Sequence, residues 1–406
     1  MTSPSLYPAA GRLLGALTLV NLLNYVDRQI LFAVYPEIQR DLGLVDSQLG
    51  LAGSAFIVVY MLVTPIAGRL GDRLPRLRVV AGGLAVWSLA TVLAGVAWGF
   101  GSLLVFRGLV GVGEACYAPL GSAMISDAYP PERRGHTLSI FNIAVPVGSA
   151  LGYLLGGLLG AWFGWRAAFF AVGAPGLALA VVLLTFDEPT RGGSEPHGLT
   201  RDVGATVGDL ARDPLYVVVT LSMAALTFVL GALAAWMPTF LVRLHDMSIS
   251  GAGVTFGIVT ALAGVVGTML GGWLGDRALR RDPRGHLQVS AAGLLLAVPV
   301  TALAIFAESP SIFWGATAVA EVLLFLNVGP LNAVIVGAAA PSIRATAVAA
   351  NILVIHLLGD ALSPWAVGAL SDRFGLRAAL VVMPPMLLLS AVLCLFAGRY
   401  VRPRES

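Results

Sequence analysis

The amino-acid sequence predicts an all-α, polytopic membrane protein with twelve transmembrane helices, in two six-helix bundles related as parallel repeats. Three observations support this prediction. Hydrophobic residues make up 57% of the 406 residues and charged residues only 12%, whereas a soluble globular protein is about 25% charged. Apolar runs of about 20 residues, long enough to cross a bilayer as a helix, recur along the chain. Short motifs of the first half also recur in the second half.

The apolar runs set the predicted spans one by one. Strands of a membrane barrel would instead alternate in hydrophobicity over about ten residues. The spans cover residues 11–35, 48–70, 77–98, 101–125, 136–161, 166–186, 214–241, 250–275, 286–307, 312–338, 345–370 and 377–399.

The basic residues predict the orientation. All 25 are arginine, and 18 of them fall in the tails and loops of one side. Five fall on the other side, at Arg40, Arg166, Arg243, Arg373 and Arg377, and two lie inside spans. By the positive-inside rule both termini are cytoplasmic. The net charge of +3 therefore reflects the membrane topology and does not indicate a nucleic-acid partner. We expect a protein of a bacterial inner membrane.

The longest polar stretch predicts the domain organisation. Residues 187–213 are rich in charge, glycine and proline, and we interpret them as a cytoplasmic linker. The linker separates an N-terminal six-helix bundle, residues 1–186, from a C-terminal one, residues 214–406.

An internal repeat relates the two halves. AGRLGDR at 67–73 recurs as GGWLGDR at 271–277, and FGWRAAF at 163–169 recurs as FGLRAAL at 374–380. Six spans separate the copies, so they have the same orientation. Parallel repeats of six helices are the arrangement of major facilitator transporters, whose substrate site lies near the membrane midplane.

The first copy carries a specific motif. GRLGDRLPR at 68–76 resembles the signature loop between helices 2 and 3 of the major facilitator superfamily, with Pro75 in place of the usual glycine. The resemblance implies that superfamily's fold and a latch on the cytoplasmic face in the outward-open state. The alternative is that the arginines only set topology. We assign gating to Gly68, Asp72, Arg73, Arg76, Asp127, Asp276 and Arg277.

Charged side chains inside two spans indicate a functional site. Asn24 and Asp27 share a face of the first span with Asn21. Arg107 and Glu114 share a face of the fourth span, about 10 Å apart along its axis. An ionised side chain at mid-bilayer costs about 2.5–3.5 kcal/mol on insertion scales, and such residues usually line ion or substrate paths.

We therefore predict one buried polar cluster in the N-terminal bundle. Asp27 and Glu114 are assigned to proton coupling. Substrate binding is assigned to Arg28, Arg107, Asn24, Tyr25 and, in the second half, Glu321. The alternative is a fully satisfied ionic cluster that only pins the first span to the fourth.

The predicted chemistry is an exchange of partners. An anionic headgroup that binds an arginine frees the paired carboxylate, which then takes up a proton more easily. The proton is the coupling ion, and we expect no other cofactor and no metal. Isosteric amides at Asp27 or Glu114 should abolish pH-driven transport while the protein still folds.

Four motifs resemble the Spinster family: LNYVDR at 23–28, RGLVGVGEA at 107–115, SDAYPPERRG at 126–135 and FNIAVPVGSALGYLLGG at 141–157. The resemblance implies a proton-coupled carrier of an amphipathic anionic lipid, such as a lysophospholipid or a sphingosine-1-phosphate-like molecule. It implies functional roles for Asp27, Arg107 and Glu114. We expect a monomer whose partners are its substrate and the membrane lipids.

Other functions stay open or are disfavoured. Anion:cation symporters, which carry carboxylates and sugar acids, share part of the first- and fourth-span motifs, and an uncoupled facilitator fits the same fold. A channel is disfavoured because the few intramembrane charges gather near one level. An enzyme is not expected, because the five histidines are scattered and the chain has no H-E-x-x-H or G-x-S-x-G pattern.

Overall fold

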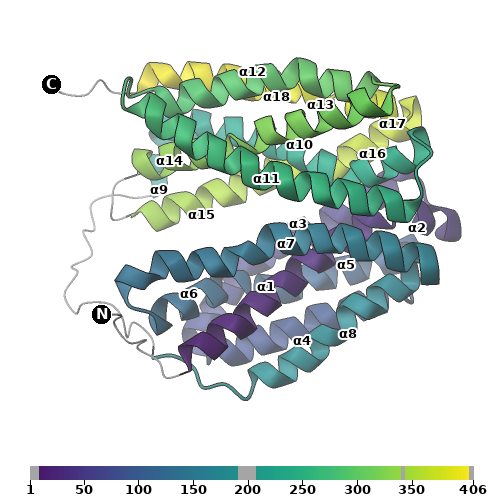
Figure 1. The fold of residues 1–406 in the computed structure, drawn as a ribbon. Helices are drawn as coiled ribbons and strands as arrows, with labels where there is room; N and C mark the ends of the chain where they lie inside the picture. The colour runs from purple at the N-terminus through teal and green to yellow at the C-terminus, as the bar shows by residue number, and fades with distance from the viewer. Residues whose placement is uncertain (1–8, 191–206, 340–342, 402–406) are drawn as a thin grey trace. The chain divides into compact units, whose positions relative to one another are not determined.

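A computed structural model describes residues 9–190, 207–339 and 343–401. In these ranges the regular elements are all helices (Figure 1). Eleven helical segments of the described residues, some of them made of two or more consecutive helices, are long and apolar enough to cross a membrane. The remaining predicted span is helix α1, Ala10–Ala33, whose polar residues lower its mean hydropathy. The predicted fold class, an all-α polytopic membrane protein, is confirmed.

The helices of the first half are α1 (Ala10–Ala33), α2 (Tyr35–Leu42), α3 (Asp46–Arg73), α4 (Arg76–Ala94), α5 (Phe100–Ala115), α6 (Ala118–Ala128), α7 (Pro131–Phe163) and α8 (Trp165–Leu183). Helix α9 (Val207–Arg212) lies within the predicted linker, of which residues 191–206 lie outside the described residues. The helices of the second half are α10 (Pro214–Leu244), α11 (Ile249–Leu279), α12 (Gly285–Phe306), α13 (Pro310–Phe325), α14 (Val328–Ala338), α15 (Arg344–Ile355), the π-helical turn η2 (His356–Asp360), α16 (Ser363–Phe374), α17 (Leu376–Leu380), α18 (Met383–Ala397) and the 3₁₀ turn η3 (Gly398–Tyr400).

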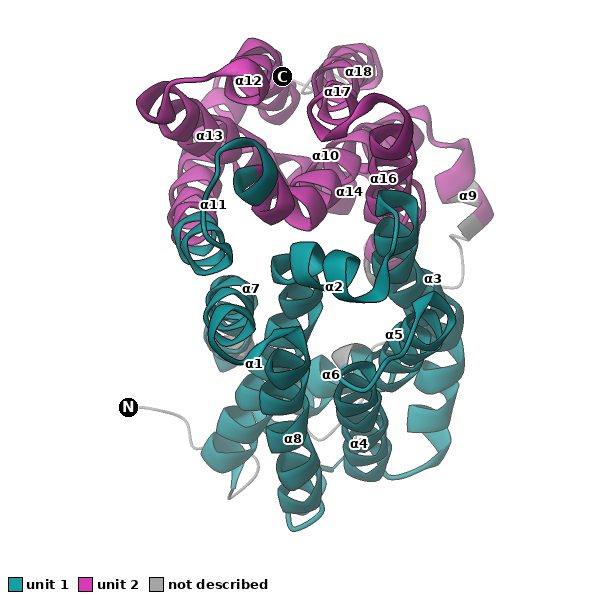
Figure 2. Cartoon of the chain, turned by 90° about the vertical axis from the view of Figure 1, so that its right-hand side faces the viewer, with its two compact units in different colours: residues 1–199, 241–257 teal, residues 200–240, 258–406 magenta. Residues whose placement is uncertain are grey.

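The chain forms two compact units (Figure 2). Unit 1 contains residues 1–199 and 241–257, so it includes the end of α10, the start of α11 and the loop between them. Unit 2 contains residues 200–240 and 258–406. In unit 1, α1 packs against α7 and α8, and α5 packs against α3 and α4. In unit 2, α12 packs against α13, α14 and α18.

Glycines on α7 allow close contact with α1. A Cβ atom at Gly148 would lie 2.7 Å from the carbonyl oxygen of Leu22, and one at Gly152 would lie 2.7 Å from that of Val26. Real Cβ atoms do not approach a carbonyl oxygen so closely. Small residues spaced by four therefore bring the two backbones together, as is common between membrane helices. This contact fixes the position of α1, which carries Asn24, Asp27 and Arg28 of the predicted polar cluster.

Two equivalent spans are each broken in two. The fourth predicted span forms α5 and α6, with the break at Cys116–Tyr117. The tenth forms α13 and α14, with the break at Leu326–Asn327. The starts of α13 and α5 differ by 310 − 100 = 210 residues, and the starts of α14 and α6 by 328 − 118 = 210. The internal repeat thus extends to the helix boundaries.

The short helix α2 is not predicted from the sequence, since all of it except Tyr35 falls between the first and second predicted spans. Pro36 stands in its first turn, where a missing N–H costs nothing. Gly43 follows it with φ of +63°, the left-handed conformation that ends many helices. These two residues were the available signal. The helix matters because Gln39 and Asp41 on it make contacts described below.

Candidate functional site

Four charged side chains of unit 1 meet as two ion pairs. Arg28 donates from Nε to Oε2 of Glu114 at 2.9 Å, which joins α1 to α5. Nη1 of Arg107 on α5 lies 3.5 Å from Oδ1 of Asp27 on α1. Each helix therefore contributes one acid and one base, and each acid pairs with the base of the other helix. The four formal charges cancel within the cluster.

The cluster is buried but incompletely hydrogen-bonded. Asp27, Arg107 and Glu114 expose at most 2% of their surface. Asp27 Oδ1, Glu114 Oε1 and the Nε and Nη1 of Arg107 make no hydrogen bond within the part of the chain that the structure describes. The Arg107–Asp27 contact is thus an ion pair without hydrogen-bond geometry. A buried polar atom without a partner costs about 1–3 kcal/mol, and more when charged. This spare capacity distinguishes the cluster from a fully satisfied ionic structure.

Arg28 is the accessible member of the cluster. Its side chain is 22% exposed, while that of Glu114 is fully buried. Its guanidinium carbon lies 5.0–5.3 Å from the ring centres of Tyr25, Phe56 and Tyr60. Three aromatic rings surround the guanidinium and attract it by cation–π interaction, and Arg28 also makes a side-chain hydrogen bond with Tyr60. An incoming anion can therefore bind Arg28 first.

Thr91 supports the cluster, and two asparagines of α1 lie nearby in the sequence. Thr91 on α4 donates a hydrogen bond to Oδ2 of Asp27. Asn21 donates to the carbonyl oxygen of Phe141 on α7 at 3.0 Å, so it is structural. Asn24 is buried, and its Nδ2 makes no hydrogen bond among the described residues. Of the predicted amides, Asn24 is thus the one with a free donor.

Glu321, predicted to bind substrate, belongs to unit 2. It lies on α13 and is fully buried. Thr260 on α11 donates a hydrogen bond to its Oε1 at 3.1 Å. Elsewhere in unit 2, His356 Nδ1 lies 2.8 Å from Oδ1 of Asp360 in the π-helical turn η2.

The predicted gating residues lie at or near the ends of α3, α4, α6 and α11. Arg76, at the start of α4, donates to Oδ2 of Asp127 on α6 at 2.7 Å and lies 4.0 Å from Glu188. Gly68, Asp72 and Arg73 lie in the last two turns of α3, where Asp72 and Arg73 are exposed. In unit 2, Asp276 and Arg277 are exposed near the end of α11, and Arg277 lies 5.9 Å from the ring of Trp273.

A bidentate pair was missed by the sequence analysis. Arg243, at the end of α10, donates from Nη1 and Nη2 to the two carboxylate oxygens of Asp46, both at 2.7 Å. It also donates to Oε1 of Gln39 at 2.6 Å. Arg243 was visible in the sequence as one of the five arginines on the less basic side. An arginine against the positive-inside rule was the signal, because a carboxylate partner offsets its charge.

Arg166 is another of these five arginines and also has a partner. It donates to Asp41, as does Nε1 of Trp165 at 3.1 Å. These hydrogen bonds lower the pKa of the Asp41 carboxyl, with the Arg166 bond as the larger cause. Both side chains of the ion pair are exposed, by 40% and 46%.

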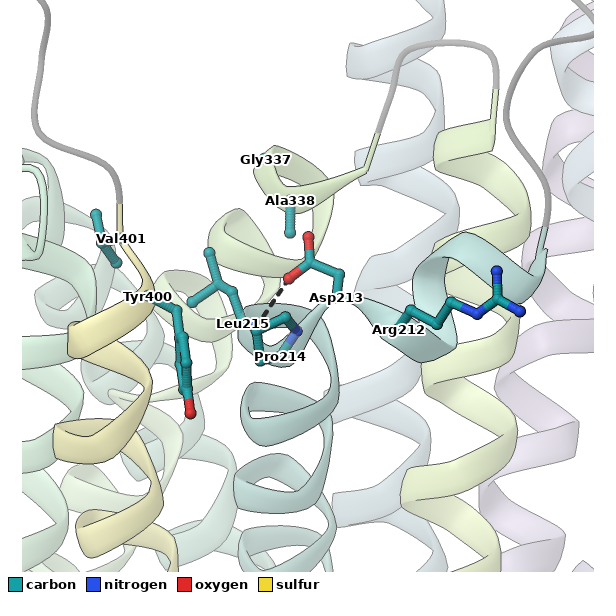
Figure 3. A pocket seen from close by; sticks show the side chains of 8 residues that line it. All are labelled: Arg212, Asp213, Pro214, Leu215, Gly337, Ala338, Tyr400 and Val401. Carbon is teal, nitrogen blue, oxygen red and sulfur yellow. Dashed lines mark hydrogen bonds between the residues drawn. The ribbon is translucent and has the colours of Figure 1, made fainter.

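A pocket of about 630 Å³ lies at the start of α10 in unit 2 (Figure 3). Arg212, Asp213 and Tyr400 are among its lining residues. Oδ1 of Asp213 accepts a hydrogen bond from the backbone N–H of Leu215 at 2.8 Å and so caps α10. The carboxylate is thus already engaged in a structural role, and none of the predicted site residues lines this pocket.

Residues 17–359 match the family model of the Major Facilitator Superfamily. Protein spinster homolog 1 of Homo sapiens is 36% identical over 418 residues, which cover 95% of this chain and 78% of that protein. Protein spinster of Drosophila melanogaster is 33% identical over 377 residues, which cover 88% of this chain and 61% of that protein.

Solved structures give a consistent result. A bacterial homologue of the human lysosomal transporter Spinster, in an inward-facing and unoccupied conformation, superposes with a TM-score of 0.89 at 29% identity, covering 97% of this chain and 98% of that chain. A nucleoside transporter superposes with a TM-score of 0.76 at 12% identity, covering 97% and 100% of the two chains, and shows the fold alone.

Proposed function

Because this chain belongs to the Spinster family of the major facilitator superfamily, we propose that it is a proton-coupled secondary transporter of an amphipathic anionic lipid. It works by alternating access in the bacterial inner membrane, with both termini cytoplasmic. The substrate class comes from the resemblance to Spinster proteins, which suggests a lysophospholipid or a sphingosine-1-phosphate-like molecule. The coupling comes from the geometry of the cluster in unit 1.

The Arg28–Glu114 pair carries this proposal. One partner is accessible and the other is fully buried. An anionic headgroup that binds the guanidinium competes with the carboxylate for the same N–H donors. Once released, Glu114 would be a buried carboxylate without its hydrogen-bonded partner, and such a charge is costly. Taking up a proton removes the cost. Substrate binding and proton binding therefore favour each other.

The second pair supports the same coupling. Arg107 and Asp27 are in contact but not hydrogen-bonded, so a small movement of α1 against α5 can exchange partners. Thr91 donates to Asp27 in the described conformation and keeps one of its oxygens satisfied. The cluster can hence pass a proton between two carboxyl groups as the arginines change partners.

A binding screen tests the substrate class. The purified full chain in detergent is heated with lysophosphatidylglycerol, sphingosine-1-phosphate or a sugar acid, because a ligand that binds only the folded state raises the melting temperature. We expect stabilisation by the two lipids, weakened when Arg28 is replaced by glutamine. Stabilisation by the sugar acid alone would overturn the lipid assignment in favour of a symporter of small organic anions.

Uptake into proteoliposomes tests the coupling. We expect a pH gradient to drive accumulation of lysophosphatidylglycerol and a protonophore to abolish it. Uptake at an equal rate and to an equal extent with the gradient collapsed would instead identify an uncoupled facilitator.

A further inference from the structure

Unit 2 contains a buried carboxyl group that forms no ion pair with the described residues. Glu321 is fully buried on α13, and its one hydrogen bond among the described residues comes from the neutral hydroxyl of Thr260. Its Oε2 makes no hydrogen bond in the described ranges. This differs from unit 1, where both carboxylates of the cluster lie against arginines.

The internal repeat explains the difference. The helices α5 and α13 occupy equivalent positions 210 residues apart. Residue 107 + 210 is Thr317, so a threonine stands where unit 1 has Arg107. Thr317 is buried on α13, and its hydroxyl oxygen also makes no hydrogen bond among the described residues. The second half has an acid on this span, at Glu321, three residues before the position equivalent to Glu114, but it lacks the base equivalent to Arg107.

The surroundings of Glu321 are apolar. It lines a cavity of about 20 Å³, with room for about one water molecule. The side chains that line this cavity from α10, α12 and α18 are valine, leucine, isoleucine, alanine, methionine and threonine, and none is ionisable. From α11 the contact is Thr260. A carboxylate here would be a buried charge with neither a cation nor a full hydration shell, which proteins avoid by keeping the group neutral.

We propose that Glu321 is a second proton-binding site, separate from the cluster of unit 1, and that it holds its proton as a neutral carboxylic acid in the described conformation. A metal cation is disfavoured as the occupant, because hard cations take six or more oxygen ligands and the cavity offers one carboxyl group and threonine hydroxyls. The proposal rests on the proposed function only in treating the protein as a carrier that uses protons.

Infrared spectroscopy detects the proton directly. The full-length chain carrying Asp27→Asn and Glu114→Gln serves as background, so that the carboxyl groups of unit 1 do not contribute. At about pH 7 a solvated glutamic acid is ionised and gives no C=O stretching band of a carboxylic acid. We expect the background protein to show this band at that pH, because Glu321 keeps its proton. Adding Glu321→Gln should remove that band. Its presence at equal intensity in both proteins would overturn the proposal.

Two threonines provide a matched pair of variants that keep Glu321. Thr260→Val removes the hydroxyl that donates to Oε1, so we expect the band to shift in frequency. Thr317→Val removes a hydroxyl of the same cavity that makes no described hydrogen bond with Glu321, so we expect no shift. Equal spectra for both variants would contradict the assignment of the band to Glu321.

A change of salt tests whether a sodium ion, rather than a proton, occupies the site at Glu321. Replacing choline chloride by sodium chloride should leave the band unchanged, because a proton occupies the site. Loss of the band in sodium would overturn the proposal in favour of a sodium site. None of these readouts measures transport, so the failure of this inference is distinguishable from the failure of the proposed function.

Discussion

Arg243 holds Asp46 by two hydrogen bonds of 2.7 Å, one to each carboxylate oxygen. The residues are 197 positions apart in the chain, and Asp46 exposes only 6% of its side chain. A bidentate, mostly buried pair of this kind is among the stronger polar contacts in proteins. It stabilises unit 1 at the start of α3, on the side that the sequence analysis places outside the cytoplasm.

We predict that Arg243→Gln lowers the stability of the folded protein by about 1.5–3 kcal/mol, because hydrogen bonds to a charged group contribute on that scale. The melting temperature of the full chain in detergent measures the effect. Arg166→Gln is the matched control, since its pair with Asp41 is exposed on both sides and such pairs contribute about 0–1 kcal/mol. Equal losses in the two variants would show that the bidentate geometry does not matter.

Asp41 contributes to the stability of the folded protein in a pH-dependent way, because its pKa is lowered in the folded state. A carboxyl whose pKa is lower in the folded state than in the unfolded state stabilises the fold at pH values above its ordinary pKa of 3.8. This stabilisation is lost as the pH falls through the pKa of the folded state. We expect Asp41→Asn to flatten the acid limb of melting temperature against pH below about pH 4. The effect is small because the pair is exposed. An unchanged acid limb would contradict the lowered pKa.

Gly111 allows α5 to lie against α3. A Cβ atom there would be 2.5 Å from the carbonyl oxygen of Phe56 and 3.0 Å from the N of Tyr60, and both of these residues contact the Arg28 guanidinium. We predict that Gly111→Ala destabilises the protein by about 1–3 kcal/mol, the usual cost of overpacking, and weakens lysophosphatidylglycerol binding.

Gly108→Ala is the control for that substitution. Its Cβ atom would meet only Val59 Cγ2, at an ordinary 3.6 Å. We expect near wild-type stability and binding. Equal effects of the two glycine substitutions would contradict the explanation by close packing at Gly111.

The Arg76–Asp127 pair tests the predicted gate. A latch requires the contact itself, whereas topology requires only a positive charge on that side of the membrane. We expect Arg76→Asp or Asp127→Arg alone to slow proton-driven uptake several-fold. The double variant restores the ion pair and keeps the number of arginines on that face, so it should recover much of the rate. Failure of the double variant to exceed the worse single variant would remove the pair from the gating mechanism.

Much of this structure could be predicted from the sequence, because lipid imposes a strong constraint. A segment such as α12 has to be mostly apolar, and it has to be helical so that its backbone N–H and C=O groups are hydrogen-bonded. The repeat of AGRLGDR as GGWLGDR then predicts two halves that have the same orientation in the membrane. The break after α5 was not predicted, because the sequence around Cys116 and Tyr117 is as apolar as an unbroken helix.

The candidate site was predictable as a set of residues but not as a set of partners. The spacing of Arg107 and Glu114 placed them on one face, yet helical periodicity cannot tell which acid meets which base. Partner choice depends on the rotation of α1 against α5, which the packing of Gly148 and Gly152 on α1 helps to set. Long-range pairs such as Arg243 with Asp46 are likewise determined by tertiary structure.

The exchange of partners at Glu114 is the central claim, and Glu114→Gln in proteoliposomes tests it most directly. The amide keeps the shape of the side chain but has no proton to bind and release. We predict that the variant loses accumulation of lysophosphatidylglycerol driven by a pH gradient, while it still exchanges internal for external lipid at equal pH on both sides. Gradient-driven accumulation at the wild-type level would contradict the claim.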